Sequence, residues 1–412
     1  MPGHSRSKNG VALLAYVPGI HALRAERAED VDGRDEPGHD EAGRTHMLHT
    51  HTVASRLAAI FALLIATIAA ASAQSPAFRV DPYWPKPLPN NWILGQVGGM
   101  AVDAQDNIWV FQRPRSLTDD EKGAALTPPR SKCCVPAPSV LVFNQAGDVV
   151  KSWGGPGDNL GYDWPLQEHA ILVDNKGFVW LSGNGKGDSM VLKFTTDGNF
   201  VKQLGKRGPL TSSTDLSQFG LVASLELDAK ANEIYAADGY GNHRIAVLDA
   251  DTGEIKRIWG AYGKTPTDDD LPAYNPDSPQ FANPVHCIAL AKDGLVFVCD
   301  RTNNRVQVFQ KDGSFVRQYV FDPATKGSGS SWGLAFSPLD KKQNFFVLID
   351  GTNNVLETVR RSDGVVVRTF GRPGRETGEF HWVHVGKFDS RGNFYTGEVD
   401  TGKRLQKWVP VE

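Results

Sequence analysis

The sequence predicts an all-β fold, a six-bladed β-propeller, from three observations. A segment with four short apolar or alternating runs recurs six times along the chain. Gly, Asp and Asn turns bound the runs, as they bound strands, and the 3.6-residue periodicity of amphipathic helices is absent from these segments. Repeats of roughly forty residues with four strands each are typical of propeller blades.

Each repeat follows one template of a first strand, a turn with Gly, a second strand ending near Asp, a polar turn with Asn, a third strand, an Asp-Gly-type turn and a fourth strand. The clearest copy spans residues 287–319. The same template recurs at 100–153, 170–204, 221–259, 333–370 and 385–408. Several copies end alike, in Ser-Trp-Gly, Gln-Leu-Gly, Ile-Trp-Gly or Thr-Phe-Gly, so we expect one blade per copy.

The last repeat is one strand short, because the chain stops at Glu412 soon after the third run. The segment 78–85, which precedes the first full repeat, can supply the missing outer strand. Closing the ring in this way removes exposed sheet edges. We therefore predict one domain over residues 74–412.

Two stretches interrupt the repeats, at 114–138 in the first blade and at 262–281 before the fourth. Loops longer than about 12 to 15 residues are uncommon in compact domains and are often functional. Either stretch could cover the mouth of the propeller channel, or be a solvated surface loop.

The N-terminal residues are expected to lie outside the propeller. Residues 1–46 are rich in charge, His and Gly without periodicity, so we expect a disordered extension or a misplaced start, with Met47 as the true first residue. Residues 47–73 combine a weakly basic start, an apolar run and Ala71-Ser-Ala73, as in a secretory signal. The run is shorter than the roughly 20 residues of a membrane-spanning helix. We expect export to a bacterial periplasm or secretion.

Composition restricts the partners. The chain is 40% hydrophobic and 22% charged with a formal net charge of -3, so it lacks the basic excess of nucleic-acid-binding proteins. The residues after Ala73 contain no run long enough to span a membrane. We expect a monomer without a membrane span that binds a small-molecule or peptide substrate.

The four cysteines are not expected to form disulfides, although exported chains often contain them. Cys133 and Cys134 are adjacent, and a bridge between neighbours distorts the peptide that joins them. Cys287 and Cys299 lie on the two strands of one hairpin, whose register the turn at Asp293-Gly294 leaves uncertain.

Three histidines stand at the same position of every second repeat. His169, His286 and His384 each open the first strand of their repeat, whereas the intervening repeats carry Gly98, Ala223 and Trp332 there. Alternate blades of a six-membered ring are related by three-fold symmetry, so the three imidazoles should converge on the central axis. Three neutral imidazoles suit zinc, with a position left open for water or substrate.

Other polar residues recur with the repeat and are expected to stabilise turns through side-chain to backbone bonds. These are Asp238, Asp300, Asp350, Arg244, Arg305 and His243. His381 does not share the register of His384, so we exclude it from the metal ligands. In contrast, Arg301 and Tyr240 have no counterpart in the other repeats, which favours a function for both.

The turns at 238–245 (Asp-Gly-Tyr-Gly-Asn-His-Arg-Ile) and 300–306 (Asp-Arg-Thr-Asn-Asn-Arg-Val) resemble the NHL repeat. Within NHL propellers, residues 78–412 are most similar to the lyase domain of peptidylglycine alpha-amidating enzyme. The resemblance implies a zinc enzyme that cleaves peptidyl-alpha-hydroxyglycine into a peptide amide and glyoxylate.

The resemblance also implies roles for individual residues. The zinc ligands of the family match His169, His286 and His384, and its catalytic Tyr matches Tyr240 in Ala-Asp-Gly-Tyr. One family arginine matches Arg301 in Cys-Asp-Arg-Thr-Asn-Asn-Arg, and Arg113 is the candidate for the second. The sequence departs from the family at two places. Gly241 replaces a disulfide cysteine, and Val385 replaces an Asp involved in calcium binding.

The implied reaction needs a base for the α-hydroxyl of the substrate. Because a tyrosine in water ionises with a pKa of about 10, this role requires nearby positive charge to stabilise the phenolate. Arg301, Arg113 and zinc could supply the charge, and an arginine could also bind the substrate carboxylate through two hydrogen bonds.

Two other functions are compatible with the repeat. The chain could be a non-catalytic NHL propeller that binds a protein or small ligand and keeps the histidines for structure. It could also be a calcium-dependent lactonase of the six-bladed kind. That family places Glu, Asn and Asp around its channel, whereas the inner strands here open with His.

Overall fold

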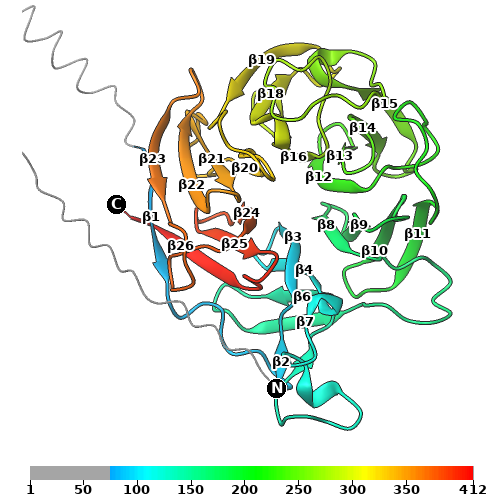
Figure 1. Cartoon of the computed structure of the whole chain (residues 1–412), viewed down its shortest axis with the longest axis vertical. Helices are drawn as coiled ribbons and strands as arrows, with labels where there is room; N and C mark the ends of the chain where they lie inside the picture. The colour runs from blue at the N-terminus through cyan, green and yellow to red at the C-terminus, as the bar shows by residue number, and fades with distance from the viewer. Residues whose placement is uncertain (1–74, 412) are drawn as a thin grey trace, which may run out of the picture. The chain divides into compact units, whose positions relative to one another are not determined.

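The computed structural model describes residues 75–411. The predicted extension (1–46) and signal peptide (47–73) lie outside these residues. Six four-stranded antiparallel sheets form a ring, as Figure 1 shows from one end of the channel. The prediction of an all-β six-bladed propeller is confirmed. No helix in the described part of the chain is long and apolar enough to cross a bilayer.

In the first three blades the strands follow one another along the chain from the channel outward, except that the short strand β5 of the insertion comes between β4 and β6 of blade 1. They are blade 1, with β3 (Gln96–Val102), β4 (Ile108–Arg113), β6 (Val140–Phe143) and β7 (Val149–Trp153); blade 2, with β8 (Glu168–Val173), β9 (Phe178–Gly183), β10 (Met190–Thr195) and β11 (Phe200–Gly205); and blade 3, with β12 (Val222–Asp228), β13 (Glu233–Asp238), β14 (Arg244–Asp249) and β15 (Ile255–Trp259).

The last three blades follow the same order, except that the outer strand of blade 6 comes from the beginning of the described chain. They are blade 4, with β16 (Val285–Leu290), β17 (Val296–Asp300), β18 (Arg305–Phe309) and β19 (Phe315–Val320); blade 5, with β20 (Gly333–Ala335), β21 (Phe345–Asp350), β22 (Val355–Arg360) and β23 (Val366–Phe370); and blade 6, with β24 (Val383–Phe388), β25 (Phe394–Glu398), β26 (Leu405–Val411) and β1 (Ala77–Asp81).

The ring closes as the sequence predicts. Strand β1 pairs antiparallel with β26, with Phe78 opposite Pro410 and Val80 opposite Trp408. The ring of Phe78 packs on Phe370 of the neighbouring blade at a centroid distance of 5.0 Å. Apolar clusters lie between each pair of adjacent blades, so the core is distributed around the ring.

The two insertions contain short elements. The insertion in blade 1 includes the 3-10 turns η1 (Pro114–Ser116) and η2 (Gly123–Ala125) and the strand β5 (Val135–Pro136), which pairs in parallel with β2 (Trp92–Ile93). The link before blade 4 includes η3 (Ala261–Gly263), and η4 (Arg301–Asn303) follows β17. Both insertions connect strands at the end of the ring where the inner strands begin.

The structure corrects the expectation that the cysteines are unpaired. Cys287 and Cys299 are directly opposite in the β16–β17 ladder, with Cα atoms 4.8 Å apart, and their sulfur atoms are bonded. The sulfur atoms of Cys133 and Cys134 are also joined. The sequence left the hairpin register open, and the register is what brings Cys287 to Cys299.

Candidate metal centre

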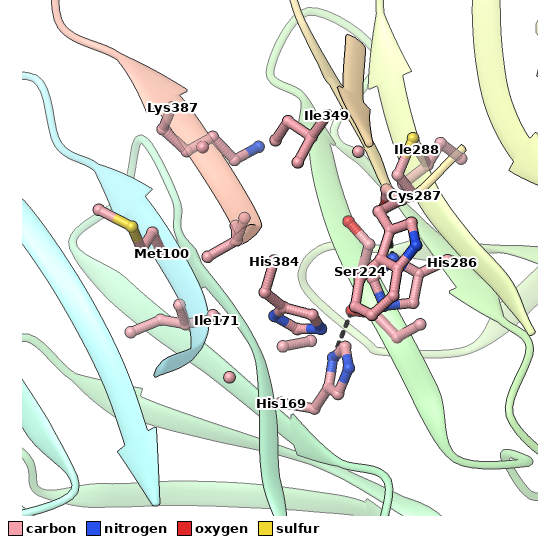
Figure 2. A pocket seen from close by; sticks show the side chains of 18 of the residues that line it. Met100, His169, Ile171, Ser224, His286, Cys287, Ile288, Ile349, His384 and Lys387 are labelled. Atoms are coloured by element: carbon pink, nitrogen blue, oxygen red, sulfur yellow. Dashed lines mark hydrogen bonds between the residues drawn. The ribbon is translucent and has the colours of Figure 1, made fainter. Parts of the chain in front are cut away.

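The three predicted histidines meet on the axis of the propeller. His169, His286 and His384 are buried near the start of β8, β16 and β24, and each offers one nitrogen to a group of atoms within 4.8 Å of one another. Figure 2 shows the three rings pointing toward one another at one end of a narrow cavity. The convergence follows from alternate blades of a six-membered ring.

Backbone carbonyls of the intervening blades orient two of the rings. His169 Nδ1 lies 2.8 Å from the carbonyl oxygen of Ala223, and His286 Nδ1 is hydrogen-bonded to that of Trp332. A carbonyl only accepts, so Nδ1 carries the proton in both rings and Nε2 keeps its lone pair. Two ring nitrogens, His286 Nε2 and His384 Nδ1, are buried without a hydrogen-bond partner.

Burial keeps the three imidazoles neutral. Desolvation lowers the pKa of each well below its ordinary value, and repulsion from Arg113 and Arg301 lowers it further. Neutral imidazoles have the lone pairs that a metal requires.

The residues present fit a zinc ion. Three neutral imidazoles are a common donor set of catalytic zinc. Zinc–nitrogen bonds of about 2.0–2.1 Å keep the nitrogens within about 4.2 Å of one another. The three ligand atoms, which lie within 4.8 Å of one another, are close to this spacing.

The channel beyond the histidines does not fit the calcium ion that the family resemblance implies. Val385 follows His384 and offers no side-chain oxygen, and the Lys387 ammonium lines the same cavity, whose volume is about 50 Å³. Lys387 Nζ lies 3.1 Å from Glu226 Oε2 on the opposite blade. A fixed ammonium therefore stands in this channel.

Tyr240 lies directly beside the histidines, in the turn after β13. Its hydroxyl oxygen is 3.1 Å from His169 Nε2 and accepts a 3.1 Å hydrogen bond from Arg301 Nη1. The turn approaches blade 4 closely, because a Cβ at Gly239 would collide with the backbone of Val285. Glycine at 239 therefore allows the turn to present Tyr240 to the axis.

Arg301 extends over aromatic rings instead of pairing with an acid. Its guanidinium carbon lies 4.4 Å from the centroid of a Trp332 ring. Its Nε is buried without a hydrogen-bond partner. This donor is available to an acceptor on a ligand.

Arg113, the third predicted catalytic residue, is buried at the end of β4, and no hydrogen bond joins it to Tyr240 among residues 75–411. Its guanidinium donates to the carbonyl of Glu168 at 2.7 Å, to Gln96 Oε1 at 2.8 Å and to Asn184 Oδ1 at 3.3 Å. All three acceptors are neutral. Burial lowers the pKa of Arg113 from its usual value, and the positive charge has no carboxylate bonded to it.

Two further residues complete the surroundings of the histidines. Trp332 lies beside His286 and His384 with ring centroids 5.8 Å apart in each case. Glu168 is buried next to His169, where it accepts from Ser139, from Trp164 and from Arg115 of the blade 1 insertion. In the repeat alignment, Trp332 occupies the position of Gly98 and Ala223. The larger side chain of Trp332 at that position is the sequence signal that could have identified it as part of the site.

The polar residues assigned to turns behave as predicted. His243 Nδ1 bonds the carbonyl of Phe281 in the link before blade 4, away from the histidine group. His381 is also outside that group. Arg244 and Arg305 form buried ion pairs with Asp238 and Asp300.

One repeat of the chain matches a known family model. The NHL repeat model matches residues 285–309, which cover β16 to β18. Together with the six four-stranded sheets, this match decides the class. The chain is an NHL-repeat β-propeller.

The NHL propeller is distantly related to curated proteins of two kinds. It is 29% identical over 247 residues to NHL repeat-containing protein 3 of Mus musculus, covering 58% of each chain. It is 26% identical over 218 residues to a probable peptidyl-alpha-hydroxyglycine alpha-amidating lyase of Caenorhabditis elegans, covering 52% of this chain and 56% of the relative. The matches thus span a little over half of these relatives.

One solved structure shows the same fold. It is a structural genomics protein of unknown function from Bacteroides thetaiotaomicron, with a TM-score of 0.50 and 14% identity over 82% of this chain and 76% of that chain. At this identity the likeness concerns the fold alone.

Proposed function

We propose that this NHL propeller is an exported zinc-dependent lyase of the peptidyl-alpha-hydroxyglycine amidating type. One observation carries the proposal: the Tyr240 hydroxyl lies between His169 Nε2 and Arg301 Nη1. A potential base is thereby held next to three metal-binding imidazoles and a cation. The distant relationship to a probable amidating lyase supports the same reaction.

Each residue of the site has a separate role in the proposed reaction. His169, His286 and His384 would hold the metal, and a bound zinc ion would supply Lewis acidity at the substrate hydroxyl. Arg301 donates a hydrogen bond to the Tyr240 oxygen and so places a positive charge beside it. The free Nε of Arg301 is the donor available to a substrate carboxylate.

The proposed reaction transfers one proton and breaks the carbon–nitrogen bond. Tyr240, once its own hydroxyl proton has been released to solvent, takes the proton of the α-hydroxyl, and the lone pair left on that oxygen forms the carbonyl of glyoxylate. The carbon–nitrogen bond breaks, and its electron pair leaves with the amide nitrogen. The proton held by Tyr240 passes to that nitrogen, which completes the amide product.

The test is glyoxylate release from an α-hydroxyglycine-extended peptide by the purified, zinc-saturated protein. Replacing Tyr240 by Phe removes the base, so we expect kcat to fall by about 10²–10⁴ while the metal content stays unchanged. Tyr83→Phe is the matched control, because this tyrosine is 86% exposed. Absence of glyoxylate from the zinc-loaded wild type would contradict the proposal and favour a propeller that only binds a ligand.

A further inference from the structure

Four blades carry an acid at the end of their second strand, on the side of the histidines. These acids are Asp238, Asp300, Asp350 and Glu398. In blades 3, 4 and 6 an arginine at or directly before the start of the third strand pairs with the acid: Arg244 with Asp238 at 2.9 Å, Arg305 with Asp300 at 2.7 Å and Arg404 with Glu398 at 2.6 Å. The repeat thus builds a charge-compensated pair in each of these three blades.

The three arginines also bind the connection that leads into their own blade. Each guanidinium donates to backbone carbonyl oxygens, those of Ser213, Asp215 and Gln218 for Arg244, Pro276 and Gln280 for Arg305, and Arg375, Glu376 and Glu379 for Arg404. A cation enclosed by one carboxylate and several carbonyl oxygens therefore recurs around the ring.

Blade 5 keeps the acid and lacks the cation. The residue opposite Asp350 in the ladder is Val355, at the position of the arginines. Two residues further along β22, Glu357 occupies the place of Gln307 and Gln406. In blade 6 this position reaches the acid, since Gln406 Nε2 donates to Glu398 Oε1 at 3.1 Å. Blade 5 consequently presents two carboxylates on one face and no guanidinium.

Both carboxylates are removed from water. Asp350 is 0% and Glu357 is 7% exposed, and Glu357 Oε2 is buried without a hydrogen-bond partner. Asp350 receives hydrogen bonds from the backbone and side chain of Asn353 and from the backbone of Thr352. Asp322, in the connection into blade 5, adds a further negative charge.

Burial raises the pKa of both acids. Burial, with repulsion from Asp322 and Asp350, raises the pKa of Glu357 to about 7. Burial also raises the pKa of Asp350 to about 6. Burial also raises the pKa of Asp300 and Glu398, so it is the missing guanidinium, and not the raised pKa, that distinguishes blade 5 from blades 4 and 6.

We propose that blade 5 binds a calcium ion where blades 3, 4 and 6 place a guanidinium. Asp350 and Glu357 would supply carboxylate oxygens, and the connection carrying Asp322 would supply carbonyl or water-mediated ligands. Calcium prefers such oxygen ligands, six to eight in flexible geometry. Among residues 75–411, only the histidines bring three ligand atoms within 4.8 Å. At most two of the carboxylates therefore bind the ion directly.

This site is separate from the histidine centre and from the proposed lyase reaction. Its role would be to neutralise the two buried acids and to tie the connection between β19 and β20 to blade 5, as Arg305 does for the link into blade 4.

The test is the effect of calcium on the zinc-saturated full chain at pH 8. We expect about one calcium per chain by equilibrium dialysis and an increase in Tm, because a ligand that binds only the folded state stabilises it. The double variant Val355→Arg, Glu357→Gln restores the arrangement of blade 4, so it should bind no calcium at this site and lose the calcium-dependent increase in Tm.

Three single variants serve as comparisons for the calcium response. Glu357→Gln alone should also lose the calcium response, which keeps the test usable if the double variant does not fold. Asp363→Asn alters an exposed acid of the same blade and should respond as the wild type does. His384→Ala should keep the calcium response, which separates this site from the histidine centre.

The proposal would be overturned by a wild type that binds no calcium and loses stability as the pH rises. That result would mean that the acids are held neutral. Their folded pKa values of about 6 and about 7 exceed the ordinary 3.8 and 4.5. Stability from neutral acids is therefore complete below the ordinary values and is lost as the pH rises through about 6 to 7.

Discussion

At the scale of single residues, the carbonyl oxygens of the intervening blades matter as much as the histidines. Ala223 and Trp332 occupy the position of the histidines in blades 3 and 5, and their carbonyls bond Nδ1 of His169 and His286. Such contacts to the second ring nitrogen fix the tautomer and the orientation of metal-binding histidines. Blades 2, 4 and 6 thus provide the three candidate ligands, and blades 3 and 5 support two of them, whereas His384 Nδ1 has no hydrogen-bond partner among the described residues.

Removal of one of the three histidines should abolish metal binding. His384→Ala removes one of three ligands, so we expect the bound zinc, about one per chain, to be lost in elemental analysis of the purified protein. His381→Ala is the matched control, because His381 lies three residues away and outside the histidine group. Equal zinc content in both variants would contradict the assignment.

At the scale of the blade, the buried pair of acid and arginine is the unit that fixes the connections. Arg305 pairs with Asp300, both with 0% exposed side chains, and binds two carbonyls of the link before blade 4. That link leads to His286. The pair therefore fixes the connection that leads to His286, one of the three candidate metal ligands.

Breaking this pair should be costly. Arg305→Ala leaves the Asp300 carboxylate buried without its cation, and removal of one partner of a buried pair costs about 3–5 kcal/mol. Urea denaturation would measure the loss. The comparison is Arg360→Ala, whose pair with Asp363 is 45% and 44% exposed. We expect about 0–1 kcal/mol there, and similar losses in both variants would contradict the role of the buried pair.

At the scale of the whole molecule, the ring depends on the pairing of its two ends. Strand β1 lies at the beginning of the described chain and completes blade 6 against β26. The three histidines come from blades 2, 4 and 6, so an open ring would displace His384 relative to the other two. Closure and the metal centre are therefore coupled.

Removal of β1 tests this coupling. A chain that begins at residue 82 exposes the edge of β26 and loses the packing of Phe78 on Phe370. We expect a lower Tm and aggregation through the free edge. A chain that begins at residue 75 retains β1 and serves as the control. Equal Tm and equal solubility of the two chains would show that closure by β1 is dispensable.

The repeat, the number of blades, the closing strand and the three histidines could all be predicted from the amino-acid sequence. These features depend on local patterns, because strand periodicity, turn residues and repeat register are properties of short segments. The register alone related His169, His286 and His384 by three-fold symmetry. Tyr240 and Arg301 stood out because the other repeats lack them.

The contacts between these residues, in contrast, depend on the folded ring. It placed Tyr240 against His169 and Arg301, kept Arg113 among neutral acceptors, and aligned Cys287 with Cys299. Each of these contacts joins segments whose spacing depends on strand register or on packing between blades. A one-residue slip of register reverses the face of every side chain. Such contacts are therefore set by the assembled ring.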